Sequence, residues 1–320
     1  MTFRLAVIND WYDKKSAVFW NKDGILRALQ VLRDRDGWET TFFKKHEKTF
    51  EWEHDYIHLN FSPNPVASAE AWKPDAYLLF ADFSRTISAE IAATGRPFAQ
   101  CYTGGRFTDY AMLPDLVFTE SKSYMGWMKS VGVKEVVQAF GTNTELFKPY
   151  PEPKIFDAFF PATGAAWKRH ELFAEAMGSR GLVCGWWQPH EPQCLEVCQK
   201  YNTAVLHHQM AESVAFLYSM AHTVLITSSD VGGSQRSVLE AMACNRPVIV
   251  MDDSTMTSEY VRECGQGAIV PPDVQQIRNA VEEWKNKEVN TRDWIMKNYS
   301  EYIYADKLRD GITKLCASAL

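Results

Sequence analysis

The residues best suited to chemistry lie between positions 226 and 252, in the sequence ITSSDVGGSQRSVLEAMACNRPVIVMD. Gly232 and Gly233 lack a Cβ atom, so the backbone here can approach a ligand closely. If a helix begins just after them, backbone amides point outward at its N-terminus, and these belong to Ser234, Gln235 and Arg236. Such a terminus favours an anion, to which Arg236 adds positive charge and Ser234 or Ser237 a hydroxyl. The segment therefore predicts a phosphate site.

Glu240 is a carboxylate inside an otherwise apolar run, Val-Leu-Glu-Ala-Met-Ala. Because helical side chains lean toward the helix N-terminus, Glu240 would point toward the glycine loop. There its oxygens can accept hydrogen bonds from two hydroxyls of a ribose or another sugar. A second interpretation stays open, in which Glu240 pairs with Arg236 on the same helical face and the glycines only turn the chain.

A strand, a loop, a helix and a second strand must position these residues. The pattern predicts the strands at 223–227 and 248–251 and the helix at about 235–244, so the two strands would be parallel. Short apolar runs alternate with helical or polar stretches elsewhere, which predicts an α/β fold with parallel sheets covered on both faces. The other expected strands are at 3–8, 40–43, 56–60, 76–80, 98–102, 116–119, 155–160, 181–185 and 204–207.

The segment SSDVGGSQRSVLEAMACNRPVIV resembles the donor site of GT-B glycosyltransferases, which have two Rossmann-like domains, and in particular the retaining family 4 (glycosyl transferases group 1). Their pattern reads Glu-Gly-Phe-Gly, four residues, then Glu-Ala-Met-Ala-x-Gly-x-Pro-Val. The resemblance implies that Glu240 is the second glutamate, which holds the nucleotide ribose. Gly232 stands where the first glutamate would be. Asp230 is the nearest carboxylate and the candidate catalytic residue for contacting the sugar.

Two more segments resemble the same family. Residues 164–168 are similar to its phosphate loop, Gly-Arg-x-x-x-x-Lys-Gly, and Lys168 matches the lysine that neutralises the donor diphosphate. The arginine of that loop is absent, and Arg236 is our hypothesis for its replacement. By the same resemblance, Gln209 and Met210 would lie beside the nucleotide base.

The domain boundary is expected near residue 150. Residues 136–149, VVQAFGTNTELFKP, resemble the family's interdomain crossover, and the proline-rich PYPEPK that follows is typical of a linker. We predict an N-terminal Rossmann-like acceptor domain at 1–150, a nucleotide-sugar donor domain at 151–295, and a C-terminal helix at 296–320 that packs back on the first domain. A length of 320 residues suits two domains. Residues 290–316 should be largely helical.

The first half contributes candidate acceptor or cleft residues. Trp11 and Tyr12 belong to an aromatic loop with interleaved lysines, which would suit a sugar or a base or would pack on the domain's own core. The run Gly104-Gly105-Arg106 follows an expected strand and would bind an anion or a sugar, or simply form a tight turn. His58, which we place at a strand end, is either a cleft residue or a structural histidine.

Composition describes a folded globular chain, with 46% hydrophobic and 23% charged residues and a net charge of −6. Seven cysteines include no CxxC pair, and the adjacent His207 and His208 would point to opposite faces of a strand, so we expect no metal. No apolar run approaches the ~20 residues of a membrane span, and the opening MTFRLAVI is too short for a signal peptide. We therefore expect a cytoplasmic protein without stable membrane insertion.

The resemblance implies retaining, metal-independent transfer of a hexosyl or pentosyl group from a nucleotide-sugar donor that is UDP- or GDP-linked. This donor is a co-substrate, and no further cofactor is expected. The acceptor would be a small molecule, a glycan or a nucleic-acid base. Three alternatives stay open: a viral-type glycosyltransferase that modifies DNA bases, a catalytically silent nucleotide-sugar binding subunit, and a non-hydrolysing sugar epimerase of the same fold.

Overall fold

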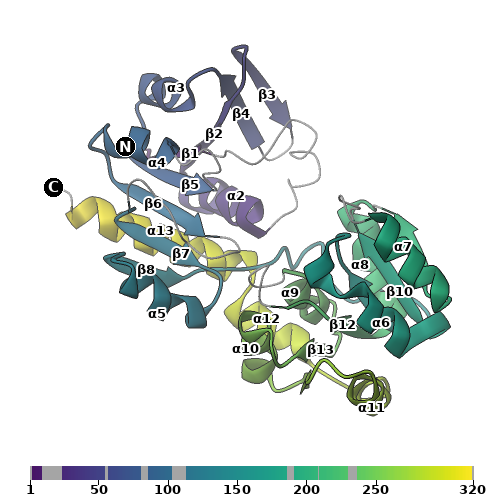
Figure 1. Ribbon diagram of the computed structural model, residues 1–320. Helices are drawn as coiled ribbons and strands as arrows, with labels where there is room; N and C mark the ends of the chain where they lie inside the picture. The colour runs from purple at the N-terminus through teal and green to yellow at the C-terminus, as the bar shows by residue number, and fades with distance from the viewer. Residues whose placement is uncertain are drawn as a thin grey trace. The chain divides into compact units, whose positions relative to one another are not determined.

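The computed structural model describes residues 2–8, 24–54, 57–80, 86–102, 113–185, 191–207, 209–229 and 236–318. The chain forms two compact units, which we describe separately (Figure 1). Unit 1 comprises Met1–Gly141 and Ser300–Leu320, and unit 2 comprises Thr142–Tyr299. The chain thus passes from unit 1 to unit 2 between residues 141 and 142 and returns between residues 299 and 300. We predicted these boundaries at about residue 150 and between residues 295 and 296.

Unit 1 contains an eight-stranded sheet in the order β3-β4-β2-β1-β5-β6-β7-β8. β5, β6 and β7 are buried along their whole lengths, as expected for strands covered by helices on both faces. The strands are β1 (Arg4–Ile8), β2 (Glu39–Lys45), β3 (Phe50–His54), β4 (Ile57–Ser62), β5 (Ala76–Phe80), β6 (Phe98–Tyr102), β7 (Leu116–Thr119) and β8 (Glu135–Gln138). The helices are α2 (Gly24–Asp36), α3 (Pro65–Trp72), α4 (Ile87–Ala92), α5 (Lys122–Ser130) and α13 (Glu301–Ser318).

The β3–β4 pair departs from the all-parallel sheet that we predicted. β3 and β4 are antiparallel, whereas the other neighbouring strands of this sheet are parallel. No strand was expected at β3. Only two residues separate the two strands, and such a short connection cannot cross over to a parallel partner, so the chain folds back as a hairpin.

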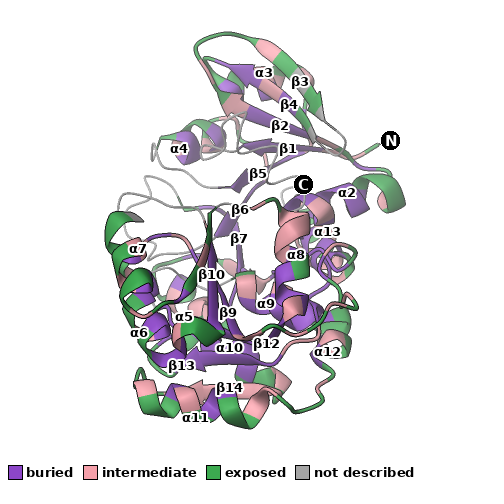
Figure 2. Ribbon diagram, turned by 90° about the vertical axis from the view of Figure 1, so that its right-hand side faces the viewer, coloured by how far each residue is buried: buried purple, intermediate pink, exposed green. Residues whose placement is uncertain are grey.

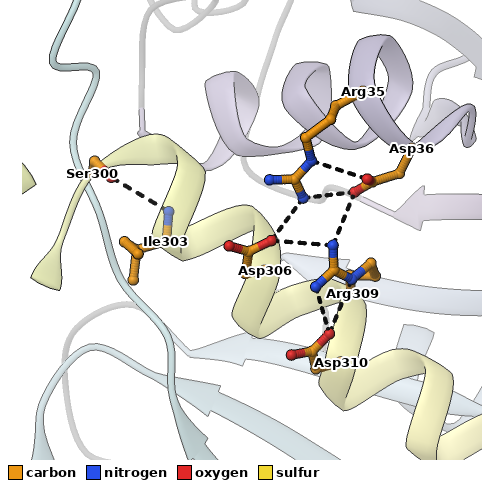
Figure 3. Close-up of polar contacts among 7 residues, drawn as sticks. All are labelled: Arg35, Asp36, Ser300, Ile303, Asp306, Arg309 and Asp310. Carbon is orange, nitrogen blue, oxygen red and sulfur yellow. Dashed lines mark hydrogen bonds and ion pairs between the residues drawn. The ribbon is translucent and has the colours of Figure 1, made fainter. Parts of the chain in front are cut away.

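The last two helices are separate, although we expected one largely helical stretch at 290–316. α12 (Thr291–Asn298) ends in unit 2, and α13 begins in unit 1 after Ser300. The Ser300 hydroxyl accepts a hydrogen bond of 3.4 Å from the backbone amide of Ile303, which is the pattern of a helix N-cap (Figure 3). Leu308 and Ile312 of α13 then join the buried core of unit 1.

A network of charges joins α13 to α2 beside this core (Figure 3). Arg35 donates hydrogen bonds of 2.7 Å to Asp36 and to Asp306, and Arg309 lies 3.2 Å from Asp306 and 3.6 Å from Asp36. The Arg35 guanidinium holds the pKa of the Asp36 carboxyl below its usual value. Because these side chains are partly exposed, the network adds only modestly to the stability that the buried apolar side chains of α13 supply.

Unit 2 contains a six-stranded, all-parallel sheet in the order β11-β10-β9-β12-β13-β14. Figure 2 shows its central strands as buried. The strands are β9 (Phe156–Pro161), β10 (Gly181–Gly185), β11 (Ala204–His207), β12 (Ala221–Ile226), β13 (Val248–Met251) and β14 (Gly267–Val270). The remaining helices are the 3₁₀ turns η1 (Ala166–Lys168) and η2 (Gly178–Arg180), and α6 (His170–Met177), α7 (Glu191–Lys200), α8 (Ala211–Met220), α9 (Arg236–Ala243), α10 (Thr255–Cys264) and α11 (Val274–Trp284).

Candidate functional site

The strand order of the unit 2 sheet reverses between β9 and β12. From β9 the chain proceeds to β10 and β11, and it then returns to the other side of β9 for β12, β13 and β14. The loops after β9 and β12 therefore diverge at the carboxyl edge of the sheet, which is where open α/β sheets bind their ligands. These two loops lead to Lys168 and to the start of α9, the residues that the sequence predicted for phosphate binding.

Hydrogen bonds hold the two loops together. The backbone amide of Ser229 donates to the Trp167 carbonyl at 3.0 Å, and the Thr227 hydroxyl donates to the Lys168 carbonyl at 2.8 Å. Thr227 is fully buried, so its hydroxyl needs such a partner. The contacts fix η1 against the end of β12. Lys168 and the segment that leads into the glycine loop are thereby neighbours, although about 60 residues of chain separate them.

Lys168 occupies an environment that disfavours its charge. Its side chain is 7% exposed, and its ammonium nitrogen lies 4.2 Å from the centroid of the Trp167 ring. Burial lowers the pKa of Lys168 to about 7. The pKa of the adjacent His170 is lowered to about 4 by burial and by the Lys168 charge. A bound diphosphate would favour the charged lysine, so this position suits an anionic ligand.

Arg169 adopts a left-handed backbone conformation with φ of 55°, at the position where the resembling phosphate-loop pattern has glycine. A non-glycine residue pays an energetic cost in this region. Its guanidinium donates two hydrogen bonds, of 3.0 and 2.5 Å, to the Asp253 carboxylate after β13. Sequence reasoning missed this pair, because nothing in the local pattern links residues 84 positions apart. The pair fixes the loop after β9 to the loop after β13.

α9 carries the described part of the predicted donor segment. Arg236 is its first residue and is exposed, and Ser237 is partly buried. The helix ends with Asn245 in a left-handed conformation, and the amides of Asn245 and Arg246 bond to the carbonyls of Met242 and Ala241. This is the Schellman arrangement, in which asparagine can replace glycine. Asp230, Gly232, Gly233, Ser234 and Gln235 lie outside the described residues.

Glu240 is partly buried and bonds to a residue that the sequence did not single out. The Tyr218 hydroxyl of α8 donates to Glu240 Oε2 at 2.8 Å. Burial raises the pKa of Glu240, and both the Arg236 charge and the Tyr218 hydrogen bond oppose this rise. Arg236 thus acts on Glu240 through its charge, whereas the Glu240 carboxylate accepts its hydrogen bond from Tyr218. A tyrosine in an apolar helix was a usable signal, because a buried phenol needs a partner. No spacing rule connects positions 218 and 240.

Gln209 and Met210, which we expected beside a nucleotide base, follow the edge strand β11. The Gln209 side chain donates to the His207 carbonyl at 2.9 Å, and Met210 is 43% exposed at the start of α8. They lie at the same carboxyl edge as Lys168, but two strands away from β9. Their contact with a base stays a prediction.

Most of the predicted acceptor or cleft residues of unit 1 lie outside the described residues. They are Trp11, Tyr12, Gly104, Gly105 and Arg106. His58 is described, and its position differs from our expectation. It is the second residue of β4 and faces Glu53 in the hairpin, with its ring 3.7 Å from Glu51. It therefore lies near the amino end of a strand, away from the carboxyl edge that ligands favour.

An open hollow of about 690 Å³ lies beside η1, between α6 and α7. Its lining is mainly apolar and includes Ala165, Arg169, His170, Cys194 and Pro272. The His170 ring nitrogen Nδ1 lies 3.5 Å from the Cys194 sulfur. The η1 turn borders both this hollow and the carboxyl edge between β9 and β12, but the hollow lies beside α6 and α7, whereas Glu240 belongs to α9.

Two kinds of feature are absent from the described part of the chain. Within the described ranges, no three histidine, cysteine, aspartate or glutamate side chains gather as a metal site would require. Among the helices of the same ranges, none is both long enough and apolar enough to cross a membrane.

Comparison with known proteins finds a family model that matches part of the chain and solved structures of similar fold. Residues 182–301 match the family model described as Glycosyl transferases group 1. The structure is similar to sucrose-phosphate synthase from Thermosynechococcus elongatus, with a TM-score of 0.75, 16% identity, and coverage of 99% of this chain and 100% of that one.

Two other solved structures are similar to nearly the whole chain. A glycosyltransferase from Rickettsia africae has a TM-score of 0.76 at 12% identity, with 98% of each chain covered. HepE of Anabaena, in complex with UDP, has a TM-score of 0.73 at 11% identity, covering 98% of this chain and 100% of that one. At these identities the likeness concerns the fold. No curated protein sequence matches the chain significantly.

Proposed function

This chain has the GT-B fold of the glycosyltransferases, with a glycosyl transferases group 1 segment at residues 182–301, and from that premise we propose that it transfers a sugar from a nucleotide-sugar donor to an acceptor. The proposal is supported by the carboxyl edge of the unit 2 sheet between β9 and β12. There the fold brings a buried lysine next to the loop that precedes a helix N-terminus, and the helix carries a partly buried glutamate.

Each of these groups has a proposed role in binding and in releasing the diphosphate. Lys168 and Arg236 would neutralise the diphosphate as it leaves, together with amides at the start of α9. Glu240 would accept hydrogen bonds from the ribose hydroxyls. Asp230 would contact the sugar. Preorganised positive groups of this kind stabilise a leaving anion without a metal, and metal independence and retention of configuration are part of the proposal.

The nucleotide is proposed to be UDP or GDP. A similar protein of known structure has UDP bound, which supports testing UDP first. The acceptor classes are those expected from the sequence: a small molecule, a glycan or a nucleic-acid base. A cytoplasmic location is also proposed, since all seven cysteines are free thiols, the state that a reducing compartment maintains.

A thermal-shift screen tests the donor site. The purified protein is heated with UDP, GDP, ADP, dTDP or CDP, each with and without its sugar, and Glu240→Ala and Lys168→Ala are compared with wild type. We expect one nucleotide to raise the melting temperature by several degrees at a concentration about 100 times its Kd, and both variants to lose the effect. Lys200→Ala, which removes an exposed lysine of α7, should keep it.

The outcome also separates the competing functions. If none of the nucleotides raises the melting temperature, the donor-site assignment is excluded. It is also excluded if a nucleotide raises the melting temperature equally in the wild type and in both site variants. If a nucleotide binds, release of nucleoside diphosphate is then measured with candidate acceptors. Release that depends on an acceptor supports the transferase, and binding without any release supports a catalytically silent subunit.

A further inference from the structure

The Glu240 carboxylate accepts a hydrogen bond from a tyrosine of another helix. Tyr218 of α8 is fully buried, and its ring makes edge-on contacts with Phe147 and Phe159, at centroid distances of 5.9 and 5.2 Å. Those two rings are themselves at most 5% exposed, so the tyrosine ring is held firmly in the core of unit 2. Its hydroxyl therefore has a defined position.

That hydroxyl meets α9 at two points. It lies 2.8 Å from Glu240 Oε2 and 3.4 Å from the Ser237 carbonyl. A phenol has one proton to donate, and the shorter contact to the carboxylate is the stronger of the two. Oε2 is thus engaged on the buried side. Glu240 keeps partial exposure, and its carboxylate makes no second hydrogen bond to the described residues, so Oε1 remains able to accept one.

We propose that Tyr218 is a positioning residue of the donor site, whose phenol orients the Glu240 carboxylate so that Oε1 faces the ribose hydroxyls. This inference rests on the proposed role of Glu240 in binding the nucleotide. Tyr218 touches no substrate in this proposal. It acts by restricting the carboxylate to one orientation and by compensating for part of its desolvation on burial.

Few other ionisable groups act on Glu240. Among the described residues these are Arg236, the exposed and positively charged first residue of α9, and the Tyr218 phenol of α8. Glu240 in turn acts on the Cys244 thiol, which follows α9 directly. Burial raises the pKa of Cys244 far above neutral, so the thiol is uncharged. Arg292 of α12, which donates a hydrogen bond to the Ala243 carbonyl, acts on Cys244 through its charge. Burial raises the pKa of Glu240, so this carboxyl is the acid whose protonation a pH profile of binding would report.

Tyr218→Phe removes the hydroxyl and keeps the ring. We expect UDP or GDP, titrated by calorimetry, to bind about tenfold more weakly to this variant at pH 7.5, as for loss of one hydrogen bond to a charged group. The phenol lowers the pKa of Glu240, so its loss should also move the acid-side fall in affinity to higher pH. A purely structural tyrosine would not shift this pH profile.

The chain offers a matched control in Tyr77. This tyrosine of unit 1 is also fully buried and donates a hydrogen bond of 2.7 Å to a glutamate, Glu70. Tyr77→Phe removes the same kind of bond far from the donor site in sequence, and it should leave nucleotide affinity and its pH profile as in wild type. Urea unfolding of both variants measures the general cost of losing such a bond.

A second variant keeps the test decisive if Tyr218→Phe folds poorly. Glu240→Asp retains the carboxylate but shortens the side chain by one methylene, which withdraws it from the Tyr218 phenol. We expect a similar loss of affinity, and no further loss in the double variant, because both changes break the same contact.

Three results would overturn the inference, and they differ in what else they overturn. If Tyr218→Phe keeps the wild-type nucleotide affinity and pH profile while Glu240→Ala loses binding, only the proposed role of Tyr218 is refuted. Additive losses in the double variant would also refute only that role. Nucleotide binding that survives Glu240→Ala would refute the proposed ribose contact, and the inference with it.

Discussion

Lys168 is held where its charge is costly, which is typical of a residue kept for binding. An ordinary lysine has a pKa near 10.5, and burial lowers that of Lys168 to about 7. Between these two pH values the unfolded chain binds one proton more than the folded chain. The free energy of unfolding therefore rises with pH across this interval, and the full cost of the buried charge is present below pH 7.

Lys168→Met should accordingly stabilise the nucleotide-free protein. We expect a gain on the order of a few kcal/mol in the free energy of unfolding at pH 6, fading as the pH approaches 10. Urea titrations at pH 6, 8 and 9.5 measure it. Lys200→Met is the control, because Lys200 also lies over an aromatic ring, Tyr201, but is exposed, and it should show no such gain. A loss of stability in Lys168→Met at pH 6 would contradict the assignment of a costly buried charge.

The helix α13 packs so closely on the unit 1 sheet that its sequence needs a glycine. A Cβ atom at Gly311 would lie 2.8 Å from Phe118 Cε1 and 3.2 Å from Leu116 Cδ2, both of which belong to β7. Phe118 is 1% exposed and has little room to move. Close approach of helix and strand thus decides the residue here, against the intrinsic preference of helices for alanine.

Gly311→Ala should destabilise the protein by about 1–3 kcal/mol, as overpacking in a filled core does. Gly126→Ala is the matched control, because Gly126 lies in α5 with no atom within 4 Å of its would-be Cβ. That variant should gain up to about 1 kcal/mol from helix propensity. Thermal or urea unfolding compares the two. Equal effects of both substitutions would show that α13 does not pack on β7 as closely as described.

The chain as a whole consists of two units with separate sheets, and the described donor-site residues belong to unit 2. Lys168, Tyr218 and Glu240 all lie between Thr142 and Tyr299. A ligand held by them should restrict local opening of the loops after β9 and β12, because binding stabilises the closed form of the segments it contacts.

Hydrogen exchange measured by mass spectrometry checks this location. We expect saturating UDP or GDP to slow exchange severalfold in peptides that cover residues 162–169 and 227–245. Peptides from the β3–β4 hairpin and from α11 should exchange as before. Glu240→Ala should remove the protection. Protection of α6 and α7 without protection of residues 227–245 would instead place the nucleotide in the hollow between α6 and α7.

Local pattern was enough for much of this protein. The strands β5, β6, β7, β10 and β13 have the predicted bounds, because a buried strand of a parallel sheet has a continuous apolar sequence. The edge strand β11 also has the predicted bounds, although it is largely exposed. Alternation of such runs with helices predicted two parallel α/β sheets, and the resemblance around Glu240 predicted the GT-B fold. The hairpin β3–β4 escaped prediction because pairing direction depends on a two-residue connection and not on apolar periodicity.

Tertiary structure decided which residues meet. Trp167 and Ser229, Arg169 and Asp253, and Tyr218 and Glu240 are pairs whose members are distant in sequence, and they come together because β9, β12 and β13 are neighbours in one sheet. The low pKa of Lys168 and the raised pKa of Glu240 follow from burial, which no local pattern reports. The candidate residues of this site could be predicted from the sequence. Their partners and their electrostatics arise only when the strands lie side by side and exclude water.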